Sequence, residues 1–543
     1  MMKKVVLAAV MLVVSLFARD LSGSEIVVAA QQDGYYTSLA KHIVRWLDEG
    51  GVSSKLVTKN NLHLGLKSGK LAFLVGYDTP SAAELNSIKS FVARGGKIVV
   101  FYSSSPALAN LMGVKILGYK KSPYPGAWSK MNFNTSFPEG VPKSILQTST
   151  VLMSATGIKG KSSVIATWMD RNGRNTTEAC FISSANGYWM THVLLADGDE
   201  KLKSRLLCAM VGSIIPKAWS YKRYQQKEVD ELLRVKSYAL KQASRRGEIR
   251  AVWDHSGCGL YPGSWERTMK ILAESKVTDI FVNVAGAGFA HYPSRVLPAS
   301  KTYSEEGDQM AMCVRAAKKY GIRVHAWILC FTATRAAPGV VADFKNRGWC
   351  LKTRDGRVSE YLDPSNRAVR ERILNAVCEL QSNYAIDGIH LDFVRWYEQS
   401  IKPSNAAEII SRFVVDCRSR IKRPRWFTVA VLGKYPSCVN AVGQDWVGWL
   451  NSNIVDYIVP MNYSDNLKVY ESLVAFQGSS QNFARKTISG IGVTANESRL
   501  DAQQVIDQIN IARKYYLAGV SLFDLDTRLE KDILPYLKLG IWR

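Results

Sequence analysis

The stretch DGIHLDFVRW, Asp387 to Trp396, has the pattern of a short buried strand that ends in polar and aromatic residues. Successive side chains of a strand point to opposite faces, so His390 and Asp392 share one face while Ile389 and Leu391 share the other. A buried charge costs free energy unless it is paired or used. The pattern therefore predicts one apolar face packed against helices and one polar face turned toward a functional interior.

Seven more apolar strands surround this one and alternate with helix-like segments over residues 249–543. Eight strand–helix repeats over this length are typical of a (β/α)8 barrel. A doubly wound open sheet is the alternative, but eight regular repeats favour closure. The predicted strands are IRAVWDH, TDIFVNVAG, IRVHAWILCF, IDGIHLDFV, WFTVAVLG, VDYIVPMNY, KTISGIGV and AGVSLFDLD.

Residues 25–216 show a second pattern of apolar strands between helices. It predicts a doubly wound parallel sheet, flavodoxin-like, with helices on both faces. The pattern is clear as far as Tyr119, fades, and returns near the helix-like segment DEKLKSRLLCAMVGSII. Residues 217–248 are charged and favour a helix, so we expect a connecting helix there.

The N-terminal stretch, residues 1–24, has the features of a secretory signal peptide. Lys3 and Lys4 precede an apolar run from Val5 to Phe17 that is short for a membrane span. We expect cleavage between Ala18 and Ser24, and an uncleaved N-terminal anchor is the alternative. The mature protein is then secreted or periplasmic, in a bacterium, with no stable membrane span.

The formal net charge of the 543-residue chain is +25, and such a charge attracts polyanions. An anionic envelope polymer is a candidate partner. No zinc-finger, homeodomain or RNP signature is present, and export also argues against nucleic acid. The nine cysteines form no CxxC pair, and no His/Asp set has ligand spacing, so we expect neither a metal nor another cofactor.

Polar and aromatic residues gather where the predicted barrel strands end, which is where barrel enzymes hold their active sites. Aromatic rings can stack on sugar rings, while carboxylates and amides bind hydroxyl groups. The expected partner is therefore a polysaccharide or an oligosaccharide. The candidate substrate-binding residues are Trp253, Asp254, Tyr292, His325, Trp327, His390, Arg395, Asn462 and Tyr463.

Hydrolysis of a glycosidic bond normally needs two carboxyl groups. Asp392 is the first candidate, with His390 one layer below it as support. Asp524, after the eighth strand, is the favoured second candidate, and Asp254 and Asp465 are the alternatives. A competing interpretation is a barrel that binds glycan without cleaving it.

The segments YLDPSNRAVRERI and YAIDGIHLDFVRW, with HYPSRVLP, GIRVHAWI and QDWVGWLNSNIVDYIVPMNY, resemble the glycosyl hydrolase-like 10 family of exported bacterial barrel proteins. The resemblance extends roughly from Arg250 to the C-terminus. It implies a glycoside hydrolase acting on a polysaccharide such as cell-wall glycan. It also implies that Asp392 is the strand-four carboxylate, Arg395 the following arginine and Tyr463 the strand-six aromatic residue. Family members often carry glutamine at Met461 and tryptophan at Ser464, which bears on the substrate.

A looser likeness connects the fourth strand to chitinase-type barrels, whose strand reads DGxDxDxE. Asp387 and Asp392 match two of the acids, but His390 and Val394 replace the middle acid and the catalytic glutamate. The chitinase mechanism therefore does not transfer to this chain.

The N-terminal half resembles the class I glutamine amidotransferase-like fold in its strand order and in the segment GYWMTHVLLADGDEKLKSRLL. Catalytic members carry a cysteine in the sharp turn after a strand. The comparable turn here, FYSSSPAL from Phe101 to Leu108, has none. The resemblance therefore implies a non-catalytic domain.

Overall fold

The computed structural model describes residues 25–31, 34–196 and 198–543, so the predicted signal peptide lies outside the described residues. The chain divides into two compact units, one ending at Glu231 and the other spanning Leu232–Arg543. Each unit has its own hydrophobic clusters. Across the described residues, no helix combines the length and the apolar character that crossing a membrane requires.

The first unit is built on a nine-stranded mixed sheet in the order β2-β1-β3-β4-β11-β10-β9-β6-β7. Five strands are parallel, as predicted: β2 (Lys55–Val57), β1 (Ile26–Ala30), β3 (Leu71–Val75), β4 (Lys97–Phe101) and β11 (Gly187–Met190). The other four pair antiparallel, which the sequence did not predict: β10 (Asn175–Ser184), β9 (Ser162–Met169), β6 (Trp128–Phe133) and β7 (Ser144–Ser149). Short connections such as Ala185-Asn186 permit hairpins but no parallel crossover. A separate pair, β5 (Val114–Lys121) and β8 (Val151–Gly157), completes this unit.

Helices cover both faces of the parallel part of this sheet, as predicted. Val28 of β1 faces a core shared with α2 (Tyr35–Glu49) and α6 (Glu200–Ile214). Its neighbours Val27 and Ala29 face the opposite core, with α3 (Leu62–Ser68), α4 (Ala82–Ala93) and α5 (Pro106–Leu111). After α6, the helix α7 (Tyr221–Leu240) occupies most of the segment predicted as a connecting helix.

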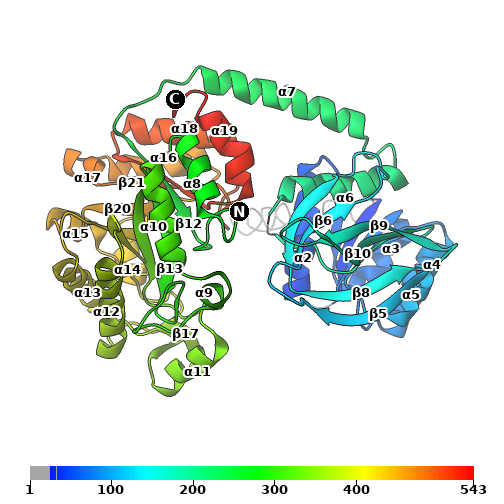
Figure 1. Ribbon diagram of the computed structural model, residues 1–543, viewed down its shortest axis with the longest axis horizontal. Helices are drawn as coiled ribbons and strands as arrows, with labels where there is room; N and C mark the ends of the chain where they lie inside the picture. The colour runs from blue at the N-terminus through cyan, green and yellow to red at the C-terminus, as the bar shows by residue number, and fades with distance from the viewer. Residues whose placement is uncertain (1–24, 32–33, 197) are drawn as a thin grey trace, which may run out of the picture. The chain divides into compact units, whose positions relative to one another are not determined.

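The second unit is a closed eight-stranded parallel barrel, which confirms the predicted fold class (Figure 1). Closure is direct, because the first strand pairs with the second strand on one side and with the eighth on the other. In chain order the barrel strands are β12 (Ile249–Asp254), β13 (Asp279–Gly286), β15 (Arg323–Leu329), β18 (Gly388–Asp392), β19 (Trp426–Leu432), β20 (Tyr457–Met461), β21 (Ile488–Gly492) and β22 (Gly519–Phe523).

Helices follow the barrel strands and surround the barrel. They are α8 (Trp265–Glu274), α10 (Gln309–Tyr320), α12 (Arg367–Asn383), α13 (Ala406–Arg420), α15 (Trp446–Asn451), α16 (Leu467–Gln477), α18 (Ala502–Lys514) and, after the π-turn Leu529–Ile533, α19 (Leu534–Leu537). Ile389 and Leu391 of β18 pack in the cluster between strands and helices, as their alternation predicts.

The barrel interior is filled by side chains in layers, as is usual for this fold. The register of β15 with β18 pairs His325 with Gly388, then Trp327 with His390, then Leu329 with Asp392. The strands run toward Asp392, which therefore lies at the carboxyl end of the barrel. His325 lies at the opposite end of the same strand pair.

Candidate active site

His325 belongs to the floor of the barrel. It is fully buried, and its Nε2 lies 2.9 Å from Asp279 Oδ1. Arg323 binds the same carboxylate with two hydrogen bonds of 2.7 Å. Burial opposes ionisation, but His325 and Arg323 hold the pKa of Asp279 at about 2. The structure therefore corrects the sequence interpretation: His325 supports the amino end of the barrel, because its position and its partners keep it away from the carboxyl-end mouth.

His390 forms the middle layer. The indole N–H of Trp253 donates to His390 Nε2 at 3.0 Å, so this nitrogen carries no proton. His390 Nδ1 then donates to Thr428 Oγ1 at 2.8 Å. Burial lowers the pKa of His390 well below its usual value, and its ring stacks on Phe281 with centroids 4.3 Å apart. His390 is thus a neutral supporting residue, and the fully buried Trp253 holds it rather than a substrate.

Asp392 ends β18 and is the upper layer of the interior face. Burial raises the pKa of its carboxyl group, while the positive charge of Arg395 and the backbone N–H of Phe393 oppose that rise. The indole of Trp327 also favours the charged form of Asp392. Trp327 Nε1 forms no hydrogen bond with any of the described residues. Trp327 and Arg395 are thus grouped with Asp392 at the carboxyl end of the barrel.

The backbone turns sharply directly after Asp392. Phe393 has a φ of 54°, a left-handed conformation that is rare for an aromatic residue. Its N–H bonds Asp392 Oδ1 at 2.5 Å, and its ring lies 4.1 Å below the guanidinium carbon of Arg395. Such backbone strain persists where the surrounding structure enforces it, often at active sites.

Asp524 follows β22 directly. Its Oδ1 accepts hydrogen bonds from the backbone N–H groups of His255 at 3.0 Å and Leu525 at 2.7 Å. Burial raises the pKa of the Asp524 carboxyl to about 8, although the His255 amide opposes the rise, and the nearby charges of Asp254 and Asp526 add to it. Asp524 is therefore largely protonated at neutral pH, which is the state that a general acid needs.

Tyr463 is a residue on which the charges of both carboxyl groups act. Burial raises the pKa of its phenol well above the usual value, and the next contributions come from the charges of Asp392 and Asp524. Its ring stacks on Phe523, which precedes Asp524, with centroids 5.3 Å apart. The fourth, sixth and eighth strands therefore bring Asp392, Tyr463 and Asp524 together at one end of the barrel.

Two arginines add positive charge to this end of the barrel. Arg395 exposes 13% of its side chain and pairs with Glu398 at 3.7 Å, and its Nε and Nη1 form no hydrogen bond with the described residues. Arg335 donates to the backbone oxygen of His255 at 2.8 Å and to the side chain of Asn283. Burial lowers the pKa of Arg335, whereas the charges of Asp254 and Asp524 raise it. Substrate oxygens are natural partners for such guanidinium groups.

Asp254 has a different role from the predicted one. Its side chain is fully buried and accepts hydrogen bonds from the loop that follows β12. Ser256 Oγ donates at 2.5 Å, Gly259 N at 2.9 Å and Gly257 N at 3.3 Å. Asp254 therefore fixes this loop, and neither substrate binding nor the role of second carboxylate fits a carboxylate so fully engaged.

Tyr292 and Asn462 are also structural. Tyr292 is fully buried in the cluster outside the barrel, edge-on to Tyr384. Asn462 is fully buried and exchanges two hydrogen bonds of 2.8 Å with Gln477 and donates a third to Ser489. The predictions were wrong for both because the side chain after a strand end can turn outward as easily as inward.

Sequence reasoning missed two charged residues of the site. Arg335 lies in the loop after β15, and the exposed Glu497 lies in the loop after β21, where its charge acts on Tyr463. Neither belongs to a strand, so the alternation of side chains gave no signal for them. Asp465, the remaining alternative carboxylate, is exposed.

Among residues 25–31, 34–196 and 198–543, no three His, Cys, Asp or Glu side chains are grouped so that they could hold a metal ion.

Comparisons with known proteins address the barrel. Residues 248–495 match the family model described as Glycosyl hydrolase-like 10. Glycosyl hydrolase DigH of Escherichia coli K12 is 27% identical over an alignment of 136 positions, and the match covers 21% of this chain and 30% of that protein. The chain thus matches less than a third of the length of this curated relative.

Solved structures with a similar fold include the PgaB (BpsB) glycoside hydrolase domain from Bordetella bronchiseptica, with 13% identity and a TM-score of 0.42. That match covers 54% of this chain and 98% of the other. A chitinase from Rhizomucor miehei matches with 14% identity and a TM-score of 0.35, over 54% of this chain and 99% of the other.

Proposed function

We propose that the protein is an exported glycoside hydrolase that cleaves O-glycosidic bonds of a polysaccharide, since residues 248–495 match the Glycosyl hydrolase-like 10 family model. Cell-wall glycan is the substrate class that the family resemblance favours. One observation carries the proposal: Asp392 ends β18 and Asp524 directly follows β22, so both carboxyl groups stand at the carboxyl end of the barrel. A pair of carboxyl groups is what glycoside hydrolysis normally requires.

The surroundings of the two carboxyl groups suggest different roles. Asp524 has a pKa of about 8 and lies near two further acids, so it is the proposed general acid that protonates the leaving oxygen. Asp392 has Arg395 beside it, which favours the ionised form. Asp392 is therefore the proposed nucleophile or general base.

Tyr463 and Trp327 are the proposed sugar contacts. Tyr463 follows β20 at the same end of the barrel with its ring on Phe523, and Trp327 lies beside Asp392 with no hydrogen bond at its indole N–H among the described residues. Arg395 and Arg335 are placed to bind substrate oxygens. His390 and Trp253 hold the layer beneath.

The test is the release of reducing ends from purified glycans, including peptide-free peptidoglycan strands. Wild type, Asp392→Asn, Asp524→Asn and a control, Glu408→Gln, are compared. Glu408 is an exposed acid on α13 with 64% side-chain exposure, so its substitution leaves the site unchanged. We expect both aspartate variants to lose at least about a hundredfold in rate and the control to lose nothing.

A synthetic aryl glycoside separates the two roles. Its leaving group needs little protonation, so Asp524→Asn should lose much less activity on it than on the natural glycan, while Asp392→Asn should lose activity on both. Glycan binding without release by the wild type would instead establish a non-catalytic binding barrel.

A further inference from the structure

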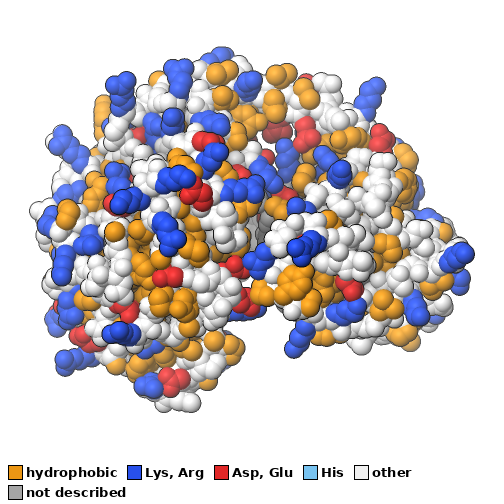
Figure 2. All heavy atoms as spheres, viewed as in Figure 1, with side chains coloured by type: hydrophobic (Ala, Val, Ile, Leu, Met, Phe, Trp, Pro, Cys, Tyr) orange, Lys and Arg blue, Asp and Glu red, His pale blue; other side chains and the backbone are white. Residues whose placement is uncertain are grey.

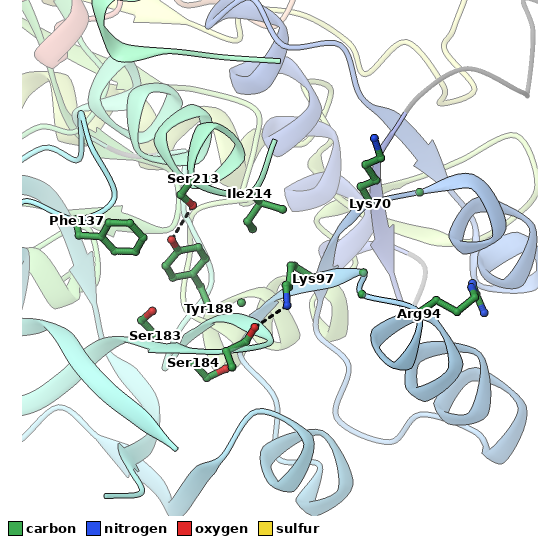
Figure 3. A pocket seen from close by; sticks show the side chains of 14 residues that line it. Lys70, Arg94, Lys97, Phe137, Ser183, Ser184, Tyr188, Ser213 and Ile214 are labelled. Carbon is green, nitrogen blue, oxygen red and sulfur yellow. Dashed lines mark hydrogen bonds between the residues drawn. The ribbon is translucent and has the colours of Figure 1, made fainter. Parts of the chain in front are cut away.

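The first unit contains a cavity of about 470 Å³ at the amino ends of β3, β4 and β11 (Figure 3). This volume is typical of pockets that bind small ligands. All of its lining residues belong to the first unit, and the proposed hydrolysis uses none of them.

All the charged side chains that line the cavity are positively charged. Lys70, Arg94 and Lys97 line it, and no aspartate or glutamate does. Lys70 is paired with Glu25 at 2.5 Å. Lys97 Nζ donates to the backbone oxygen of Ala185 at 2.8 Å, which leaves further N–H donors on the ammonium group. In the described part of the chain, neither Arg94 nor Lys97 forms an ion pair, so the lining favours an anion.

The other lining side chains suit a sugar. Phe137 is 55% exposed, which is unusual for so large an apolar ring, and it offers a face on which a sugar ring could stack. The hydroxyl of Tyr188 is hydrogen-bonded to Ser213 at 2.8 Å, and Ser183 adds another hydroxyl group. Figure 3 shows Phe137, Tyr188 and Ser213 close together, with Lys97 on the neighbouring strand.

Two of the residues that line the cavity are glycines whose positions exclude a side chain. At Gly187, where φ is 127°, a Cβ atom would lie 2.0 Å from the backbone oxygen of Ile98. At Gly96, a Cβ atom would lie 2.5 Å from the ring of Phe91. Side chains are excluded at both positions, so backbone atoms line this part of the cavity.

From this combination we infer that the cavity is a second glycan-binding site, which takes an acidic sugar residue. The sugar ring stacks on Phe137, its hydroxyl groups bond the serine and tyrosine hydroxyls, and its carboxylate pairs with Lys97. The net charge of +25 predicts that the protein binds anionic polymers, and this cavity is the proposed place where they bind. It does not depend on hydrolysis by the barrel.

The test is calorimetric titration of the full-length protein with a trigalacturonate, and with its uncharged methyl ester as the matched neutral ligand. The variants are Lys97→Gln and Phe137→Ser. The control is Lys89→Gln, because Lys89 is an exposed residue of α4 outside the cavity, and its substitution removes the same charge. Figure 2 shows Lys and Arg side chains spread over the visible face, so this control is needed.

We expect the acid to bind at least tenfold more tightly than the ester. Lys97→Gln should weaken binding of the acid tenfold or more, and Phe137→Ser should weaken binding of both ligands. Lys89→Gln should change either affinity less than twofold. Melting temperatures and glycan hydrolysis should match those of the wild type in all three variants.

Three results would overturn the inference. Equal affinity for acid and ester would exclude recognition of the carboxylate. Equal weakening by Lys97→Gln and Lys89→Gln would reduce the effect to net charge. Displacement of the sugar by inorganic phosphate at the same concentration in wild type and Phe137→Ser would mean that the cavity binds an anion without a sugar ring.

Discussion

At the scale of single residues, Asp524 is the group whose protonation should limit the reaction. Its pKa of about 8 lies above neutral pH, and burial raises the pKa of Asp392, which sets the other limit, above its usual range. We therefore expect a bell-shaped dependence of kcat/KM on pH, with loss of activity as pH rises through about 8. Steady-state rates from pH 4 to 10 measure this, and a rate that still rises at pH 10 would contradict the role of Asp524 as acid.

The raised pKa of Asp524 should also lower the free energy of unfolding at neutral pH. The unfolded chain ionises Asp524 near pH 4 and the folded chain only near pH 8, so its stability contribution is complete below pH 4 and falls as pH rises to 8. Between pH 4 and pH 8, each rise of one pH unit lowers the free energy of unfolding by at most about 1.4 kcal/mol. Asp524→Asn should therefore be inactive yet more stable than wild type, with a gap that widens from pH 5 to pH 7.5.

Urea unfolding of the two proteins at both pH values measures this gap. Asp343→Asn is a suitable reference, because Asp343 is 50% exposed in a surface pair with Arg347. An unchanged gap between wild type and Asp524→Asn at the two pH values would show that Asp524 ionises normally in the folded protein.

At the scale of secondary-structure elements, the floor of the barrel depends on Asp279, which joins β13 to β15 through Arg323 and His325. Asp279→Asn weakens the hydrogen bonds that its buried carboxylate accepts from the part-exposed Arg323 and shares with His325, and loss of a hydrogen bond to a charged group typically costs about 1.5–3 kcal/mol. Asp343→Asn, which breaks a surface pair, should cost less than about 1 kcal/mol. Chemical denaturation compares the two, and similar losses would contradict the structural importance of the floor.

After β20, Asn462 is expected to support the structure, while the next residue, Tyr463, is expected to contact the substrate. Asn462→Ala would leave Gln477 and Ser489 without their partner, at a cost of about 1–3 kcal/mol in stability. Its KM should stay unchanged, whereas Tyr463→Ala, one residue further, should raise KM. Paired melting and kinetic measurements decide this, and a raised KM for Asn462→Ala would restore its predicted role in substrate binding.

The eight barrel strands could be predicted because each is an apolar run between helix signals. The alternation in β18 also placed His390 and Asp392 correctly on the inner face. It could not reveal which end of a strand a residue occupies, and so His325 was assigned to the mouth. It also could not reveal hydrogen-bond partners, and so Asp254 and Asn462 were taken for ligands of a substrate. Arg335 and Glu497 depend on loop conformation, which a local pattern does not encode.

At the scale of the whole molecule, the two units have separate hydrophobic cores. We expect two thermal transitions in differential scanning calorimetry, because units with separate cores can unfold independently. Asp279→Asn should lower the midpoint of only one transition. A single transition that shifts as a whole in this variant would show that the units unfold together.

Barrel closure has a consequence for the timing of folding. β22 pairs with β12, and the partners Gly519 and Ile249 lie 270 residues apart along the chain. Contacts between such distant segments raise the contact order and form late, after the loop entropy of the intervening chain has been overcome. Asp524 follows β22, so the proposed acid joins Asp392 only when the barrel closes. During vectorial synthesis the proposed catalytic pair is thus absent from every shorter folding intermediate, and hydrolytic competence would report the completed barrel.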